Sequence, residues 1–224
     1  MARKTGTSTK PRRPLSRERV LGAAVALADA DGVEALSMRK LAKELGVEAM
    51  SLYNHVANKE DVLDGIVDVA LAEIVLPPPD ADWKTGVRDT AISVHETLLR
   101  HPWASDLWMG QKPGPARLRY GDSLLGCFRN AGFSKDLTYH AYHIIESYIL
   151  GYTSQVLSFR AVDTEQFEEL TASFLRGDFT AEYPHFTEHA LQHMEPEPGQ
   201  EDVSGYELGL DLIVDALERL RDTT

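Results

Sequence analysis

The stretch that decides the fold runs from residue 37 to residue 53 and reads Ser37-Met-Arg-Lys-Leu-Ala-Lys-Glu-Leu-Gly-Val-Glu-Ala-Met-Ser-Leu-Tyr53. It has the pattern of two short helices joined by a tight turn. Gly46 falls where such a turn needs a positive φ angle, and Ala42 is small where two helices must cross closely. The stretch therefore predicts a helix-turn-helix unit, although small helical bundles that bind no DNA also contain such turns.

The second helix of this unit is expected over about residues 48–55. Val47 and Leu52 are spaced to face a three-helix core, which leaves the opposite side of the helix free to enter the major groove of DNA. The side chains expected on that outward side are Ala49, Met50, Ser51, Asn54 and His55.

Apolar residues keep a helical spacing on both sides of this unit. Upstream, Ser16 is placed as the N-cap of a helix that ends at Asp31-Gly32. Downstream, Asn58 is placed to cap a helix that runs to about residue 75 and is ended by three prolines. The alternation of a strand never persists, so the sequence predicts an all-α fold. Further helices are expected over about 82–99, 103–108, 115–131, 134–160, 164–175, 184–193 and 206–220.

Charge divides the chain into two parts. Residues 1–61 carry 11 Lys and Arg against 8 Asp and Glu, whereas residues 62–224 carry 12 against 27. A basic part suits a polyanion, and DNA would repel the acidic part. We therefore expect a flexible basic arm over 1–15 and a helix-turn-helix DNA-binding domain over 16–61. A larger helical domain for effector binding and dimerisation is expected over 62–224, with the helix at 58–75 bridging the two. The arm is equally compatible with a solubilising tail.

The composition also excludes several classes of protein. No apolar run reaches the ~18 residues that a membrane span needs, and the single cysteine, Cys127, cannot form an intrachain disulfide. We expect a cytoplasmic protein with no membrane partner and with Cys127 as a small buried side chain. The sequence has no phosphate-binding loop, nucleophile elbow or paired-cysteine motif, so neither an enzyme nor a cofactor is expected.

Residues 16–75 resemble the N-terminal domain of the TetR family of bacterial transcriptional repressors. The resemblance rests on four stretches in order: Leu-Ser-Met-Arg-Lys-Leu-Ala at 36–42, Leu-Gly-Val at 45–47, Ser-Leu-Tyr-Asn-His-Val at 51–56 and Asn-Lys-Glu-Asp-Val-Leu at 58–63. Weaker similarity to the tetracycline-repressor branch continues at 98–101, 130–134, 148–151 and 209–213. The resemblance implies a homodimeric, all-helical repressor that releases operator DNA when it binds a small molecule.

The same resemblance assigns roles in DNA binding to individual residues. Arg39 matches a base-reading arginine, whose guanidinium can bind the edge of a guanine. Ser37, Tyr53 and His55 match positions that touch backbone phosphates or the adjoining bases. Lys59 matches a lysine that meets a phosphate.

Three positions depart from the tetracycline repressors on the DNA side. Ala49 and Met50 replace a polar residue and a proline, and they offer only apolar contact, for instance to thymine methyl groups. Met38 stands where a hydroxyl residue would bind phosphate. We therefore expect a different operator sequence and the loss of that phosphate contact.

The ligand side departs further from the tetracycline repressors. Trp108 aligns with their magnesium-binding histidine, and Ser158 lies near the position of an acidic residue from the partner subunit. Neither side chain suits magnesium, so we expect no metal and reject tetracycline-magnesium as the effector. A flat or apolar effector is expected to contact a mainly aromatic set. The alternative is that most of these side chains fill the core. The set is Trp103, Trp108, Met109, Phe128, Tyr139, His143, Ser147 and Phe174.

Other features leave alternatives open. His185, His189 and His193 form one stripe of a helix, which suits either a solvated face, a lid over the pocket or, less readily, a transition metal. Glu146 is expected either to pair with His143 or to touch an effector.

Apolar faces at about 134–160 and 206–220 exceed what one subunit needs, so a homodimer is expected to bury them. Two rival functions remain open. One is a regulator without an effector, and the other is a carrier or enzyme whose basic head is incidental.

Overall fold

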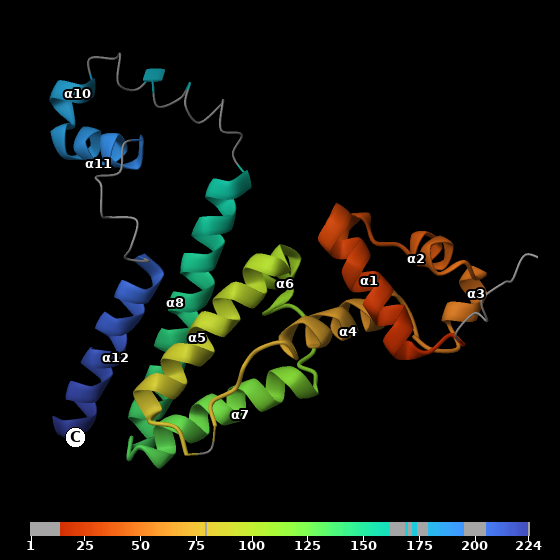
Figure 1. Ribbon diagram of the computed structural model, residues 1–224, viewed down its shortest axis with the longest axis horizontal. Helices are drawn as coiled ribbons and strands as arrows, with labels where there is room; N and C mark the ends of the chain where they lie inside the picture. The colour runs from red at the N-terminus through yellow and green to blue at the C-terminus, as the bar shows by residue number, and fades with distance from the viewer. Residues whose placement is uncertain are drawn as a thin grey trace, which may run out of the picture.

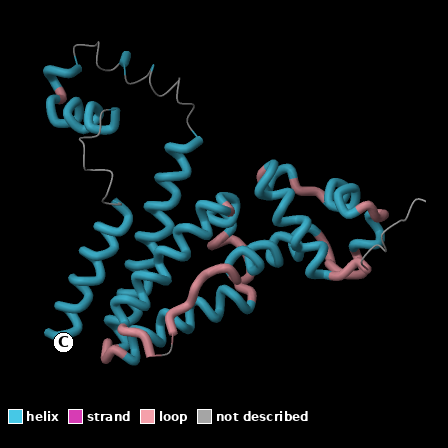
Figure 2. The backbone as a smooth tube through the Cα atoms, in the orientation of Figure 1, coloured by secondary structure: helices cyan, strands magenta, loops and turns pink. Residues whose placement is uncertain are grey.

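The protein is a chain of helices, as the sequence predicted. The computed structural model describes residues 14–78, 80–161, 169, 172–173, 179–194 and 205–223, and over these ranges it contains helices, turns and loops but no strand (Figure 1, Figure 2). Residues 1–13, most of 162–178 and 195–204 lie outside the described part, and so do the basic arm, Phe174 and most of the helix expected at 164–175.

Three helices form a small N-terminal unit, which we call the head. It is made of α1 (Arg17–Asp31), α2 (Met38–Leu45) and α3 (Ala49–Leu52). The predicted caps are confirmed: the Ser16 hydroxyl accepts from the Arg19 N–H, and the Ser37 hydroxyl accepts from the Lys40 N–H. Gly46 has φ of 65°, the left-handed conformation that the turn between α2 and α3 requires.

The helix expected at 48–55 is shorter than predicted. It covers Ala49–Leu52, and the chain then continues in turns to His55, whose N–H donates to the Leu52 carbonyl. Leu52 is fully buried, so this short helix is held against the head by its own apolar side chain.

A fourth helix, α4 (Lys59–Leu71), leads from the head to the larger part of the molecule, which we call the body (Figure 1). Asn58 caps it by accepting from the Asp61 N–H at 2.8 Å, as predicted. The helix packs on α1 in the head and on the body. The body helices are α5 (Trp83–Arg100), α6 (Pro102–Leu107), α7 (Pro115–Asn130), α8 (Lys135–Ala161) and α12 (Gly205–Thr223).

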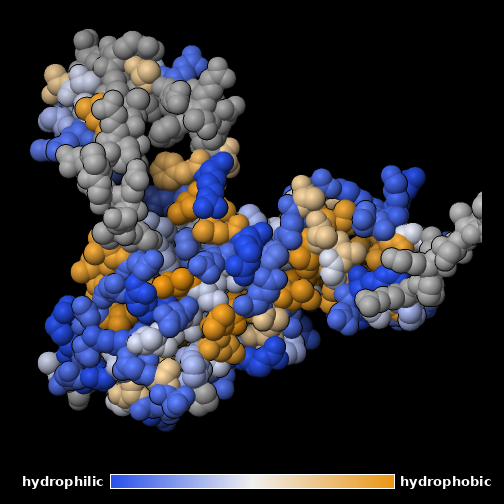
Figure 3. All heavy atoms as spheres, in the orientation of Figure 1, coloured by the Kyte–Doolittle hydropathy of each residue, from blue (hydrophilic) through white to orange (hydrophobic). Residues whose placement is uncertain are grey.

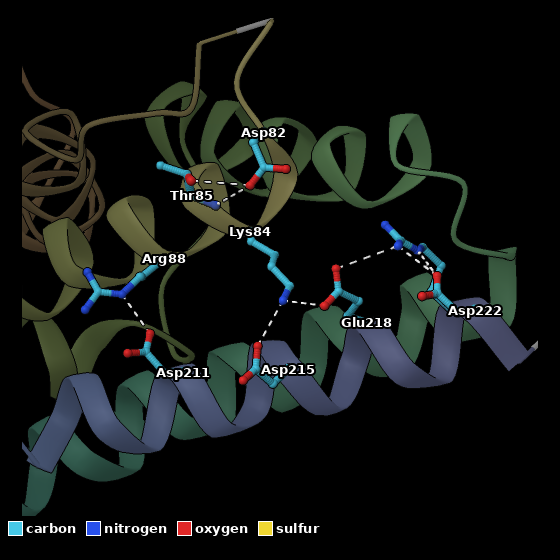
Figure 4. A network of polar contacts seen from close by, with 9 residues as sticks. Asp82, Lys84, Thr85, Arg88, Asp211, Asp215, Glu218 and Asp222 are labelled. Atoms are coloured by element: carbon cyan, nitrogen blue, oxygen red, sulfur yellow. Dashed lines mark hydrogen bonds and ion pairs between the residues drawn. The ribbon is translucent and has the colours of Figure 1, made fainter.

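A network of ion pairs attaches α12 to α5 (Figure 4). Lys84 and Arg88 project from α5 toward four carboxylates of α12. These pairs offset part of the negative charge that residues 62–224 carry. Exposed pairs of this kind are individually weak, but a row of them fixes which side of α12 faces α5. The pairs join Lys84 to Asp215 and Glu218, and Arg88 to Glu207 and Asp211.

Two further helices precede α12 in the sequence. They are α10 (Phe179–Glu182) and α11 (Pro184–Met194), which pack on each other. The side chains of His185 and His189 are exposed on α11, whereas the side chain of His193 lies outside the described residues. The role of the histidine stripe therefore stays a hypothesis.

Candidate functional site

The outward face of α3 is small, exposed and largely uncharged. Met50 is 74% exposed and Tyr53 45%, although both are large side chains that a stable core would normally bury. Asn54 is also exposed, while Ala49, Ser51 and His55 are half-buried around the buried Leu52. The face can therefore make apolar contacts through Met50 and polar contacts through Tyr53 and Asn54.

Groups that suit phosphate or a base edge flank this face. Arg39 is exposed on α2, and Lys59 is exposed at the first position of α4. Ser37 is exposed at the start of α2, where its oxygen already accepts from a backbone N–H. Its O–H can still donate, so the capping bond does not prevent a contact with a phosphate oxygen.

An ion pair that the sequence analysis missed holds the head together behind this face. Arg17 binds the Asp61 carboxylate through both terminal nitrogens, at 2.7 and 2.8 Å, and also donates to the His55 carbonyl. Asp61 accepts a further bond from the Ala57 N–H. The Arg17 guanidinium and that N–H lower the pKa of Asp61 to about 2. Arg17 is therefore a structural link from α1 to the end of the α3 turn.

A second polar cluster joins the head to the body. Asp29 of α1 accepts from Trp103 Nε1 and faces His101 Nδ1, both at 2.7 Å. The other nitrogen of His101 lies 3.4 Å from a Glu73 oxygen beyond the end of α4. Trp103 thus has its polar atom committed to the junction between head and body, away from any effector.

A third cluster ties α4 to the start of α7. Asp68 accepts from the Ala116 N–H at 2.7 Å and from the Arg117 N–H at 3.3 Å, so it caps α7 from outside the helix. Asp64 accepts from the Lys112 N–H in the preceding loop. A Cβ atom at Gly114 would overlap the Asp68 carboxyl, which explains why glycine stands there.

The structure divides the residues expected to contact an effector. Phe128 lies in the core against Trp83 and Phe133, at the far end of α7. The other members described are Trp103 at the head junction, Trp108 in the core, Met109 exposed at the end of α6, and Tyr139, His143 and Ser147 exposed on α8. The described members of the set therefore lie in separate places: in the core, at the head junction and on the exposed side of α8.

An open groove lies instead between the loop after α6, the outer face of α7 and α8. Its volume is about 460 Å³. Met109 is the member of the expected set that lines it, and Tyr142 contributes a wall from α8. The described residues that line it are Met109, Gln111, Pro113, Arg117, Leu118, Gly121, Asp122, Leu125 and Tyr142.

A second groove of about 370 Å³ lies on another side of α7. The chain after α4, including Pro77 and Pro78, forms part of its lining, and Cys127 reaches it from α7. Cys127 is half-buried and not fully buried as expected, and its burial raises the pKa of the thiol, which disfavours the reactive thiolate. Of the expected effector residues that the structure describes, none lines this groove.

Arg117 separates the first groove from the aromatic core. Its guanidinium lies 5.6 Å from the centre of the Trp108 ring and donates to the Trp108 carbonyl. On α8, the Tyr142 hydroxyl donates to Glu146 at 2.7 Å. Glu146 thus pairs with Tyr142, and not with His143, whose ring nitrogen instead lies 2.8 Å from the Tyr139 carbonyl.

The positions compared above with a magnesium site carry poor ligands for that ion. Trp108 is buried, and the Ser158 hydroxyl donates to the Ser154 carbonyl on its own helix. Within the described ranges, no group of three or more His, Cys, Asp or Glu side chains is arranged to hold a metal ion.

Two family models match the chain over almost all of its helices. "Bacterial regulatory proteins, tetR family" matches residues 20–66, and "Tetracyclin repressor-like, C-terminal domain" matches residues 76–221. The chain belongs to the TetR family. It is a DNA-binding transcriptional regulator with a helix-turn-helix head and a ligand-binding C-terminal domain.

Relatives within the TetR family cover most of the chain. An HTH-type transcriptional regulator of Saccharopolyspora erythraea is 35% identical over 79% of this chain and 74% of its own length. The class C tetracycline repressor protein of Escherichia coli is 30% identical over 94% of both chains. The structure of the TetR family protein ActR of Streptomyces coelicolor in complex with actinorhodin has the same fold, with a TM-score of 0.74 at 23% identity, over 93% of this chain and 99% of ActR.

Among the residues that the structure describes, no helix combines the length and the apolar composition that crossing a membrane requires.

Proposed function

We propose that the protein is a homodimeric repressor that binds a palindromic operator and leaves it when a small, largely apolar effector occupies the body. The observation that carries this proposal is the exposed α3 face with Arg39 and Lys59 beside it, on a chain of the TetR family. The relatives are regulators, which supports a binding protein in place of an enzyme. Its place of action would be the cytoplasm, where the operator lies.

The DNA contacts follow from the chemistry of the head. Arg39 would read a guanine, and Met50 with Ala49 would contact thymine methyl groups. Contacts to phosphates or to polar base edges would fix the head on the duplex. We assign these contacts to Ser37, Ser51, Tyr53, Asn54, His55 and Lys59.

A dimer is supported by the apolar residues that the ion-pair network leaves uncovered. The acidic side of α12 faces α5, so Leu208 and Leu212 on another side are 53% and 63% exposed. On the adjacent α8, Ile144 and Phe159 are 44% and 53% exposed. Figure 3 shows hydrophobic residues on the surface where α12 and the end of α8 lie. Four helices from two copies would bury these residues and set two heads about one DNA turn apart.

The effector site that the geometry favours is the groove at Met109, Arg117 and Tyr142. It is open to a ligand, it borders the aromatic core, and the backbone N–H of its Arg117 donates to Asp68 on α4. An effector that moves Arg117 would therefore act on the helix that carries Lys59. ActR, which shares this fold, was crystallised with actinorhodin, and that supports a small-molecule effector here.

The test is an equilibrium DNA-binding assay on the DNA that flanks the protein's own gene, at several salt concentrations. Specific, palindrome-dependent binding with a steep salt slope is expected. Arg39→Ala should lower operator affinity by about 5–150-fold per half-site, whereas Lys59→Ala should weaken binding to all sequences and reduce the salt slope by about 1 per subunit. Arg119→Ala, an exposed arginine on α7, is the matched control and should change neither.

Two results would redirect the proposal. Weak binding that is indifferent to sequence, also on a random operator library, would overturn the specific repressor and favour a carrier. Specific binding that no ligand of the groove relieves would favour the effector-independent regulator.

The dimer is tested by Leu212→Glu, which places a charge in the proposed interface. Sedimentation should show monomers, and operator affinity should fall at least about 100-fold because one half-site is lost. Val75→Glu, at an equally exposed apolar residue beyond α4, is the control and should leave a dimer. A dimer that survives Leu212→Glu would exclude this face.

A further inference from the structure

Two hydrogen-bonding groups of the body are buried with no partner among the described residues. They are the indole Nε1 of Trp108, which is 1% exposed, and the hydroxyl of Tyr120, also 1% exposed. Their rings meet edge to face with centres 5.7 Å apart. Leaving such groups unpaired is costly, because burial removes them from water without a replacement bond.

Both groups are donors. An indole N–H can only donate. Burial raises the pKa of Tyr120 far above its usual range, so the phenol keeps its proton at neutral pH and presents an O–H. What both lack is therefore an acceptor, and a buried acceptor oxygen from outside the chain would satisfy either one.

The two donors adjoin the groove described above. Neither donor lines the groove itself, but Trp108 lies under Arg117, and Tyr120 is near enough to Arg117 and Tyr142 for both to affect its pKa; Arg117 and Tyr142 line the groove. Tyr142, another lining residue, packs close to Gly121 and has its own hydroxyl committed to Glu146. A flat ligand that enters from the groove and displaces Arg117 from the Trp108 ring would meet both donors.

The charged groups around this place are Arg117, Asp122 of the groove lining, and Glu146, whose nearness raises the pKa of Tyr120 further. A free carboxylate on the ligand would meet two like charges against one opposite charge. An ammonium would offer no acceptor to the two donors. An uncharged ligand with an acceptor oxygen avoids both costs.

We propose that Trp108 Nε1 and Tyr120 OH are specificity-determining donors for the carbonyl oxygen of an uncharged, planar aromatic ketone or quinone. The inference rests on the proposed function of the groove and names the chemical class of its effector. The two donors stay unpaired in the free protein and are satisfied by the ligand, so ligand binding recovers the cost of their burial.

The first experiment is equilibrium dialysis of the full-length protein with matched probes. 9-Fluorenone and fluorene share one tricyclic frame and differ in the carbonyl acceptor, and xanthone and xanthene form a second pair. Each ketone should bind about 10-fold or more tightly than its partner, although the partner is the more hydrophobic of the two. 9-Fluorenone-2-carboxylate should bind more weakly than 9-fluorenone.

Variants then assign the preference to the two donors. Tyr120→Phe and Trp108→Phe should each reduce the ketone preference several-fold, whatever they do to the affinity for the frame itself. Trp103→Phe, which removes an indole N–H already bonded to Asp29, is the control and should leave the preference unchanged. Equal binding of both probes of each pair, or a preference that survives both variants, would overturn the proposal while leaving the groove as an effector site. No binding of any probe up to its solubility would remove the groove as well.

A second experiment needs no ligand. Tyr120→Phe removes an unpaired hydroxyl, so the melting temperature of the free protein should stay constant or rise. Tyr206→Phe removes a buried hydroxyl that donates to the Ala91 carbonyl at 2.7 Å, so it should lower the melting temperature by about 2–4 °C. Equal losses in the two variants would show that Tyr120 is satisfied within the free protein and would contradict the proposal.

Discussion

The head and the body treat their polar groups differently. In the head and at the adjoining start of α4, Ser16, Ser37 and Asn58 each cap a helix, and Arg17 and Asp61 pair across 44 residues of sequence. In the body, four side-chain atoms are buried without a partner among the described residues: Thr90 Oγ1, Trp108 Nε1, Tyr120 OH and Thr138 Oγ1. No such atom lies in the described part of the head.

This difference matches what each part does. The head must present a fixed face to a rigid duplex, and satisfied caps and pairs hold α3 in one place before DNA arrives. In the proposed function the body changes when a ligand binds. The unpaired donors would give that ligand something to satisfy, so their cost in the free protein would become affinity in the complex.

The largest loss of stability is expected when a buried leucine is shortened to alanine, once in the core of the head and once in the core of the body. Leu52 in the head and Leu124 in the body are almost fully buried, so Leu→Ala at either should cost about 2–5 kcal/mol. The head has the smaller core, and Leu52 is the buried anchor of α3. Leu52→Ala should therefore abolish operator binding while the body keeps its helical signal and its ligand binding, as followed by circular dichroism and dialysis.

Leu124→Ala provides the matched comparison. It should broaden or lower the thermal transition of the body and weaken ligand binding, while operator binding at low temperature persists. If both variants lost both functions equally, the head and body would unfold as one cooperative unit, and the contrast between them would not extend to stability.

The next effect concerns the pairing of Asp61. Asp61→Ala removes two bonds from Arg17 and one from the Ala57 N–H, all partly exposed, so the loss should be about 1–2 kcal/mol. The turn that follows α3 would lose its link to α1, and operator affinity should fall several-fold. Asp31→Ala, which breaks the more peripheral pair with Lys40, is the control and should cost less.

The same carboxylate predicts a pH dependence. The pKa of Asp61 is about 2 in the folded protein against 3.8 for the free side chain, so the folded state prefers it ionised. The resulting stability is complete above about pH 4 and is lost as the pH falls toward 2. The difference in melting temperature between wild type and Asp61→Asn should therefore shrink over that range, and a constant difference would contradict the assignment.

The sequence could predict what depends on neighbours along the chain. The N-caps at Ser16, Ser37 and Asn58 and the left-handed Gly46 are local features, and all are confirmed. The third helix was overestimated, because periodicity does not reveal that the chain leaves the α-helix after Leu52.

The sequence could not predict contacts between residues far apart in the chain. In the sequence, Trp103 and Trp108 look equally suited to a core or to a ligand contact. In the structure, the indole N–H of Trp103 donates to Asp29, 74 positions away, whereas that of Trp108 has no partner among the described residues. Similarly, Phe128 looks like a ligand contact until its packing on Trp83 and Phe133 is known. The spacing of aromatic residues along the sequence predicts which of them enter the core. It does not predict which of their N–H and O–H groups find a hydrogen-bond partner there.

A smaller effect is expected at the link between the two parts. Asp68→Ala removes the cap of α7 and should cost about 1 kcal/mol, as for other N-caps. Asp68→Asn keeps an acceptor oxygen and should cost less. If α4 carries the effector signal, Asp68→Ala should also reduce the shift in operator affinity caused by a bound ketone probe, while Asp68→Asn should preserve most of it. Equal shifts in wild type and Asp68→Ala would place the signal elsewhere, for example through Asp29.

The smallest effect is expected at His95, which, like Tyr206, is a polar group of the body that has a hydrogen-bond partner. His95 Nδ1 lies 2.7 Å from Thr153 Oγ1, whose proton is donated to the Ile149 carbonyl, so the histidine is the donor. Its ring stacks on Tyr206 with centres 4.1 Å apart. Burial, helped by Arg160 and opposed by Glu96, lowers the pKa of His95.

That shift has a defined sign. The unfolded chain binds a proton at His95 near pH 6.5 and the folded protein only at lower pH, so the contribution of His95 to stability is complete above pH 6.5 and is lost as the pH falls. His95→Asn keeps a donor for Thr153 and does not titrate. The melting temperature of wild type should therefore drop slightly more than that of His95→Asn between pH 7.5 and pH 5, with His140→Asn, at an exposed histidine, as control. If the melting temperatures of wild type and His95→Asn fell in parallel with pH, the imidazole would protonate as easily in the folded protein as in the unfolded chain. Burial would then not disfavour its charged form.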